Sequence, residues 1–208
     1  MRSKEFCMFS GVLSIGKVEM SDKIPTACTN GRDVMYNPEF INTLDDKELN
    51  FVVLHEALHK VYQHMHMWKK LFKQNPQLTN MAADYVVNYS IYEADKSNHL
   101  TVMPKGGLFD HKYANMTTKQ IFDLLQESGE QPQQGHDEHD WEGAQEMTEA
   151  EVRTTERQID QALRQGEIIR GKMEGNTNRS INELLKPKVD WREQLRDFVT
   201  TICKSKDV

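Results

Sequence analysis

The chain has 208 residues, a formal net charge of −6 and 38% hydrophobic residues. This length suits one domain, or one domain with an extension, and it is enough to bury a substantial core. An acidic chain is poorly suited to general nucleic-acid binding, because the phosphate backbone attracts basic surfaces. The sequence has no run of about 18 apolar residues, so we expect neither a nucleic-acid partner nor a membrane span.

The cysteine content indicates a reducing compartment. Cys7, Cys28 and Cys203 are far apart and form no CxxC pair, which disfavours a disulfide framework and a thiolate zinc site. The apolar stretch that reaches Ile15 is interrupted by Glu5 and by serines, which is not typical of a signal peptide. We therefore predict a cytoplasmic location.

The N-terminal part is predicted to form strands. Residues 8–36 are expected to be extended, and Asn30-Gly31 favours a tight hairpin turn before a returning strand over residues 33–36. Asn37-Pro38 ends this strand. We expect a small N-terminal sheet.

The hydrophobic period then becomes helical. Residues 43–46 supply a cap and early acidic side chains, and residues 47–73 contain neither glycine nor proline. Apolar residues recur there at steps of three and four, which predicts one long helix with a buried face. Asn75-Pro76 closes it, and a second helix is predicted over residues 78–95.

The C-terminal part is predicted to be mostly polar. Thr117 opens a short third helix through a capping-box pattern, whereas residues 129–146 have the composition of a loop. Residues 148–151 cap a charged helix that reaches about residue 175. A last helix over residues 190–203 has one apolar side and is expected to pack back on the core.

These patterns divide the chain into three parts. We predict a core over residues 1–125, a polar acidic loop over residues 126–147 and a charged helical extension over residues 148–208. Large apolar residues are sparse between residues 126 and 183, so the low mean hydropathy of −0.72 describes the extension rather than a weak core.

The main chemical feature is an HExxH motif, His55-Glu56-Ala57-Leu58-His59, inside the long predicted helix. Positions i and i+4 of a helix share one face one turn apart, so two imidazoles can bind a single zinc ion. Glu56 would face the metal and act as general base. The alternative is a pair of hydrogen-bonded core histidines. Since two histidines and a glutamate are costly to bury without partners, we favour a centre with one zinc ion.

Catalytic zinc keeps three protein ligands, so a third residue is needed. Asp84 is our candidate, because it is an isolated carboxylate on the apolar second helix; the alternative is that it orients a ligand histidine. On a continuous helix His66 lies two turns beyond His59, and His64 lies on another face. His139 could fold over the site, although the composition of its segment favours a solvated loop. These histidines stay open as replacements or supplements.

The combined order of these motifs resembles the putative metallopeptidase domain that is often found ahead of a VWA-like domain in bacterial and phage proteins. The matching segments are residues 25–32, 36–40, 55–59 with His64, 80–88, 103–104, 139–141 and 188–192. The resemblance implies an α+β, mainly helical, zincin-like fold. In it, a small twisted N-terminal sheet packs on the HExxH helix, and a second helix presents the third ligand.

By the same resemblance, the function is zinc-dependent hydrolysis of a peptide or protein substrate. A partner ATPase follows from the resemblance alone, and the chain is expected to lack room for a VWA-like domain after the Trp191 helix. Our hypothesis is that His55, His59 and Asp84 hold zinc, with a peptide lying along the edge of the N-terminal sheet. The competing hypothesis is a catalytically silent binding or assembly protein that is stabilised by its metal.

Overall fold

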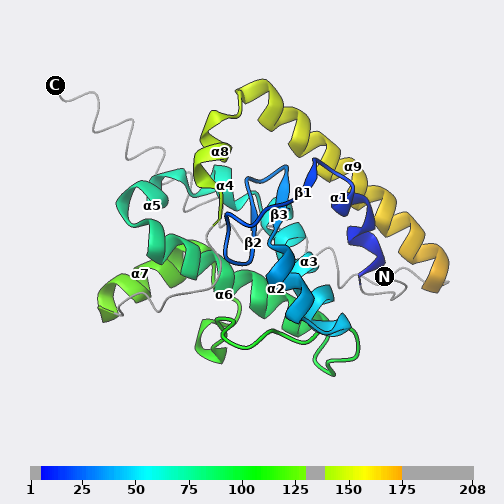
Figure 1. Cartoon of the computed structure of the whole chain (residues 1–208), viewed down its shortest axis with the longest axis horizontal. Coiled ribbons are helices and arrows are strands. Elements are labelled where there is room, and N and C mark those ends of the chain that lie inside the picture. Colours follow the sequence, from blue (N-terminus) through cyan, green and yellow to red (C-terminus); the bar gives the residue numbers. More distant parts are fainter. Residues whose placement is uncertain (1–5, 130–138, 175–208) are drawn as a thin grey trace.

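The computed structural model describes residues 6–129 and 139–174, and helices dominate it (Figure 1). Three short strands, β1 (Val18–Met20), β2 (Ala27–Thr29) and β3 (Val34–Tyr36), form one sheet in the order β1-β3-β2. β1 runs parallel to β3, and β2 runs antiparallel to it. The predicted class, α+β and mainly helical with a small N-terminal sheet, is confirmed.

The turn between β2 and β3 is built as its sequence predicts. The side-chain oxygen of Asn30 accepts hydrogen bonds from the backbone N–H groups of Arg32 and Asp33. Gly31 has a φ of 93°, a left-handed conformation that glycine adopts without the steric cost of a Cβ. The turn therefore sets the register of the hairpin, with Thr29 opposite Val34.

The residues before the sheet are helical, so the prediction of an extended segment is wrong for residues 8–13. They form η1 (Cys7–Phe9) and α1 (Ser10–Leu13). Met8 and Phe9 are buried in one cluster with Phe51, and Val12 is fully buried in another. A helix places such closely spaced apolar residues on one side, whereas a strand would alternate them between two faces.

Two capped helices follow the sheet. α2 (Pro38–Thr43) begins after Asn37, whose side chain accepts the backbone N–H groups of the first turn. α3 (Asp46–Val61) begins after Asp45, within the predicted cap of residues 43–46, and Asp45 forms a capping box with Glu48. α3 lies against the sheet, because Val52 packs in one cluster with apolar residues of β2 and β3.

The prediction of one helix as far as residue 73 is wrong. α3 ends at Val61, Gln63 has a φ of 53°, and the chain continues as α4 (His64–Met67) and α5 (Lys69–Gln74). A left-handed residue other than glycine costs roughly 1–2 kcal/mol, so tertiary contacts must offset it. The redirected chain buries His64 and Met65 at 2% and 0% exposure, which supplies such contacts.

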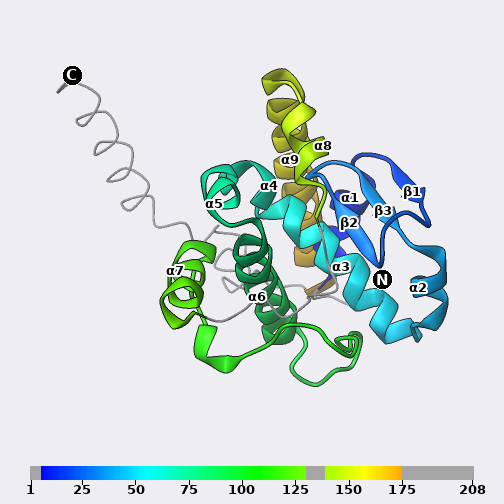
Figure 2. The same cartoon turned by 60° about the vertical axis from the view of Figure 1, so that its left-hand side comes forward.

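α6 (Pro76–Ala94) is the second long helix of the core, and Asn75 caps it with Pro76 in the first turn. It runs antiparallel to α3 (Figure 2). His55 contacts Asn88, whereas His59, four residues later on α3, contacts Asp84, four residues earlier on α6. The apolar residues between the two helices are Phe51, Leu54, Leu58, Val87 and Ile91. After η2 (His111–Tyr113), α7 (Thr118–Ser128) packs on the other side of α6, with the predicted capping box at Thr117.

Part of the segment predicted to be a loop is a short helix with a buried face. α8 (Trp141–Glu146) begins after Asp140, whose side chain accepts the backbone N–H of Gly143. Trp141 is 2% exposed and stacks on Phe72 of α5 with ring centroids 4.4 Å apart. The sequence interpretation missed this anchor because polar residues surround the single tryptophan.

α9 (Glu149–Glu174) is the long charged helix predicted from the Thr148–Glu151 capping box. It lies along η1 and α1 (Figures 1 and 2) and buries Ile159 and Ala162 against them. The predicted helix over residues 190–203 lies outside the described residues, and the three-part division of the chain stays a prediction. Among the helices that the structure describes, none is long and apolar enough to cross a membrane.

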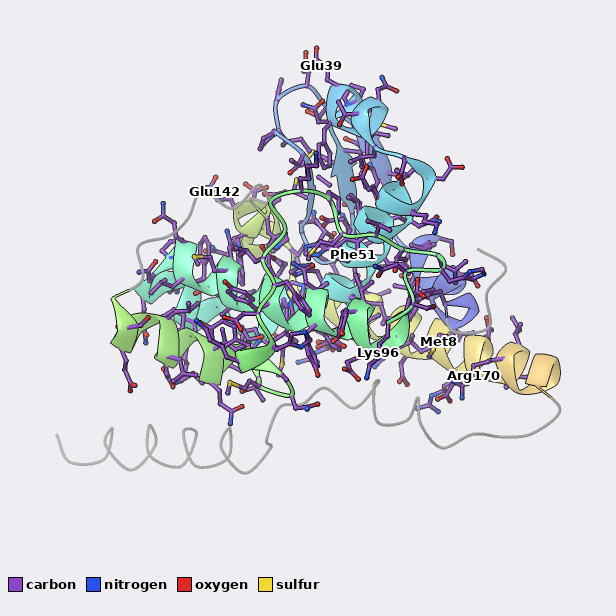
Figure 3. All side chains as sticks on the ribbon, turned by 90° about the horizontal axis from the view of Figure 1, so that it is seen from below. Met8, Glu39, Phe51, Lys96, Glu142 and Arg170 are labelled. Carbon is purple, nitrogen blue, oxygen red and sulfur yellow. The ribbon has the colours of Figure 1, made fainter. Side chains whose placement is uncertain are left out.

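The contact between α9 and η1 depends on a glycine. A Cβ added at Gly166 would overlap the backbone of Met8, whereas a Cβ at Gly171 would meet nothing within 4 Å. Figure 3 shows Met8 and Arg170 at the end of the molecule where η1 meets α9. Backbone cannot move as cheaply as a flexible side chain.

We expect Gly166→Ala to lower the free energy of unfolding by about 1–3 kcal/mol, because the added methyl group overpacks this contact. Gly171→Ala is the matched control, and it should raise that free energy by up to about 1 kcal/mol through helix propensity alone. Urea denaturation of the two variants measures both effects. Equal stabilisation by the two alanines would contradict the close approach at Gly166.

Candidate metal centre

Four buried side chains converge between α3 and α6. His55 and His59 come from α3, Asp84 comes from α6, and His139 comes from the residues just before α8. Each offers one ligand atom, and these four atoms all lie within 4.8 Å of one another. The structure thus brings together the three predicted ligands and adds His139, so the prediction that His139 lies in a solvated loop is wrong.

The spacing of the four donors suits a single small cation. His55 Nε2 lies 3.0 Å from His59 Nε2, and Asp84 Oδ1 lies 3.6, 3.4 and 3.0 Å from the Nε2 atoms of His55, His59 and His139. Bonds of about 2.0–2.1 Å to a tetrahedral zinc ion would place neighbouring ligand atoms about 3.3 Å apart. Three imidazole nitrogens and one carboxylate oxygen are also a donor set that zinc accepts.

Asn88 fixes the proton of His55. Its Nδ2 donates to the carbonyl oxygen of Leu108 at 2.9 Å, which turns Oδ1 toward His55 Nδ1 at 2.8 Å. Because Oδ1 can only accept, His55 Nδ1 carries the proton, and the lone pair of Nε2 faces the cluster. A second partner that orients a ligand in this way is usual for metal-binding histidines.

His64 holds His59 in the same manner. The Nδ1 atoms of the two rings lie 3.0 Å apart, and His64 Nε2 lies 3.4 Å from Thr118 Oγ1. Burial lowers the pKa of His64 to about 3, so His64 is neutral, and its Nδ1 can accept a hydrogen bond from His59 Nδ1 when its own proton is on Nε2. His64 therefore lies behind His59, outside the group of four. The sequence interpretation placed it on another helix face, because it did not include the left-handed turn at Gln63.

A family comparison agrees with this geometry. Residues 3–150 and 130–207 match the family described as "Putative metallopeptidase domain", which covers nearly the whole chain. The chain belongs to this family. The resemblance stated from the sequence motifs is thereby confirmed. No curated protein and no solved structure matches the chain.

Charges inside this metallopeptidase domain centre on Asp84. Burial raises the pKa of Asp84, but its polar contacts with His139, His55 and His59 outweigh burial and hold that pKa well below the usual value. Burial lowers the pKa of His139, but the hydrogen bond and charge of Asp84 outweigh it and raise that pKa. Burial and the neighbouring histidines lower the pKa of His59 well below 6.5. The carboxylate is thus a fixed negative charge that three imidazoles face.

Glu56 lies in α3 beside His55 and His59 and is 1% exposed. Its charge acts on groups on two sides, since it raises the pKa of His139 and contributes to the raised pKa of the buried Tyr36. Lys60 is also buried, and its Nζ donates to the carbonyl oxygen of Ile15 at 2.8 Å. Burial lowers the pKa of Lys60 to about 8, although Glu56 opposes this shift. Glu56 is therefore a buried carboxylate whose charge reaches both His139 and Tyr36.

His66 does not join the cluster. It lies beside the hairpin turn, where a Cβ on Gly31 would be 3.2 Å from His66 Nε2. The straight helix that would have carried His66 two turns beyond His59 ends at Val61. The fourth donor is His139. The sequence feature that could have indicated its burial is Trp141, an apolar residue two positions later in a polar stretch.

Proposed function

We propose that the protein is a zinc-dependent metallopeptidase with a zincin-like active site. The observation that carries this proposal is the set of donor spacings of 3.0–3.6 Å around Asp84 and between the HExxH histidines, with Glu56 next to them in the same helix. Membership of the metallopeptidase family supports it. His55, His59 and Asp84 would hold one zinc ion.

Each residue has a role in hydrolysis. Bound zinc supplies a Lewis acid that polarises a carbonyl group and lowers the pKa of a water molecule. Glu56 accepts a proton from the attacking water and then donates it to the leaving amine nitrogen. Asn88 and His64 hold the two HExxH rings with their Nε2 atoms toward Asp84, so the donors need little reorganisation.

The outer edge of β2 is the proposed place for a peptide or protein substrate. Hydrogen bonds from Asn37 N to Thr26 O and from Asn30 N to Asp33 O pair β2 with β3. Since these bonds alternate along an antiparallel strand, the backbone groups of Ala27 and Thr29 point away from β3. An extended peptide can add to these groups as a further strand.

One observation favours the second candidate, a catalytically silent protein that is stabilised by its metal. His139 offers a fourth protein donor, and zinc sites with four protein ligands are usually structural, whereas catalytic ones keep a position open. In that case the centre would contribute stability or an assembly surface without turnover. A cytoplasmic location and a partner ATPase are also proposals; the first rests on the cysteine pattern and the second on family resemblance.

Removing the metal tests the main proposal. We expect 1,10-phenanthroline to abolish cleavage of a peptide library and zinc to restore it, because Glu56 alone cannot polarise the carbonyl. At a zinc concentration about 1,000 times the Kd, binding adds about 4 kcal/mol, so the melting temperature should fall by roughly 10 °C on removal.

The non-chelating isomer 1,7-phenanthroline is the control, and metal content is measured by mass spectrometry. Undiminished cleavage by a metal-free preparation would refute a metallopeptidase. A melting temperature that depends on zinc in a protein without any cleavage would favour the silent alternative.

A further inference from the structure

We propose that the segment His139–Trp141, called here the His139 arm, is a built-in plug of the metal centre. His139 completes the donor set as a fourth protein ligand, and the arm covers the peptide-binding edge until it withdraws. This inference rests on the proposed function and adds to it a closed resting state. Three observations carry it: the position of the imidazole, the backbone contact of Asp140 and the anchoring of Trp141.

The His139 ring lies at the place where a fourth ligand is expected. Its Nε2 is 3.0 Å from Asp84 Oδ1, and its centroid is 4.0 Å from that of the His59 ring. The side chain is buried, and its Nδ1 has no hydrogen-bond partner among the described residues. Burial of an imidazole is costly unless its polar atoms are used, and the contact of Nε2 with the donor cluster supplies that use.

The arm also occupies the edge to which a substrate would add. The backbone N–H of Asp140 donates to the carbonyl oxygen of Thr29 at 3.2 Å. This carbonyl is one of the outward-facing groups of β2, so an extended peptide next to the metal would need the same acceptor. Peptide and arm therefore compete for one hydrogen bond as well as for one coordination position.

Trp141 fastens the arm. Its indole stacks on Phe72 and packs with Met65, and its Nε1–H donates to Asn80 Oδ1. A buried tryptophan whose N–H is satisfied is a strong anchor, because its large apolar ring and its polar atom are both used. The side chain of Asp140 caps α8 and keeps the following turn in place.

The other three donors do not depend on the arm. His55 and His59 belong to α3 and Asp84 belongs to α6, and these helices pack on each other through their own apolar side chains. Asn88, which belongs to α6, also holds the His55 ring without help from the arm. Withdrawal of His139 would leave three protein ligands and one open position, which is the arrangement of catalytic zinc sites.

Cobalt substitution tests closure independently of catalysis. The wild-type protein, His139→Ala, Trp141→Ala and the control His99→Ala, an exposed histidine, are loaded with Co²⁺ and titrated with acetohydroxamate. We expect the visible spectrum of the wild type and of the control to stay unchanged. His139→Ala should keep one Co²⁺ and change its spectrum on titration, and Trp141→Ala should respond at higher acetohydroxamate concentration.

Cleavage of the peptide library by the zinc forms gives a second measurement. If the arm is closed at least nine-tenths of the time, His139→Ala should cleave about tenfold faster or more. A wild-type cobalt spectrum that responds as readily as that of His139→Ala would overturn the plug. So would loss of the metal from His139→Ala, because His139 would then be indispensable.

The two proposals fail separately. If the cobalt spectra behave as expected and no variant cleaves peptides, closure by the arm is supported and the metallopeptidase proposal fails. If Trp141→Ala does not fold, His139→Ala still decides, because it leaves the indole and its stacking partner in place.

Discussion

Replacing Glu56 with glutamine is expected to lower kcat/KM for peptide cleavage by about 10²–10⁴-fold, the usual contribution of a general base. Glutamine has nearly the same shape but cannot accept the proton of the attacking water. Zinc should stay bound at one ion per chain, because Glu56 is not among the four converging donors. The pair of measurements, lost turnover with retained metal, separates a base from a ligand.

The variant is best measured both alone and together with His139→Ala. If the arm restricts the wild type, His139→Ala alone cleaves faster. The double variant then shows the loss of the base as a fall from that higher activity. Glu127→Gln is the matched control, since Glu127 is an exposed glutamate on α7. Unchanged cleavage by Glu56→Gln would show that another group moves the proton, or that the cleavage comes from a contaminant.

Local signals in the sequence predict where several elements begin. The cap within residues 43–46 and the capping box at Thr117 each start a helix where expected, whereas Asn75-Pro76, predicted to end the first helix, also caps the second. These signals work because they satisfy backbone N–H groups within a few residues, so no distant part of the chain is needed. The turn at Asn30-Gly31 succeeds for the same reason.

The end of α3 could not be predicted in this way. No glycine or proline marks Gln63, yet it adopts a left-handed conformation. Its cost is offset by distant partners, since His64 contacts His59 and Met65 packs with Trp141. A break that tertiary contacts stabilise leaves no signal in the nearby sequence, and this break decides that His64 lies behind the candidate metal centre.

The candidate site shows the same division between local and distant information. The HExxH spacing places His55 and His59 together because both belong to one helix. Asp84 could be proposed from the cost of an isolated carboxylate on an apolar helix. His139 stayed an open alternative, with a solvated loop favoured, because it comes from a polar segment; the packing of Trp141 against α4 and α5 brings it inward.

Replacing Asp84 with alanine is expected to weaken zinc binding by at least about 100-fold. Structural zinc sites bind with roughly 10–16 kcal/mol shared by four ligands, so one ligand accounts for about 3 kcal/mol. Asp84 is also the only carboxylate among the four donors, and without it three imidazoles would face the cation with no negative ligand. Competition with a chromogenic chelator measures the affinity, and Asp123→Ala, a change in a surface ion pair of α7, is the control.

Affinity alone does not distinguish a ligand from a residue that orients the histidines, because loss of an orienting partner costs about 10–100-fold. Asp84→Cys separates the two roles, since a thiolate bound to Co²⁺ produces a sulfur-to-metal charge-transfer band in the near ultraviolet. We expect this band in the cobalt form of Asp84→Cys and not in that of the wild type, whose four converging donors include no sulfur. Full affinity in Asp84→Ala, or absence of the band in a Co²⁺-loaded Asp84→Cys, would assign Asp84 an orienting role and leave His55, His59 and His139 as the ligands.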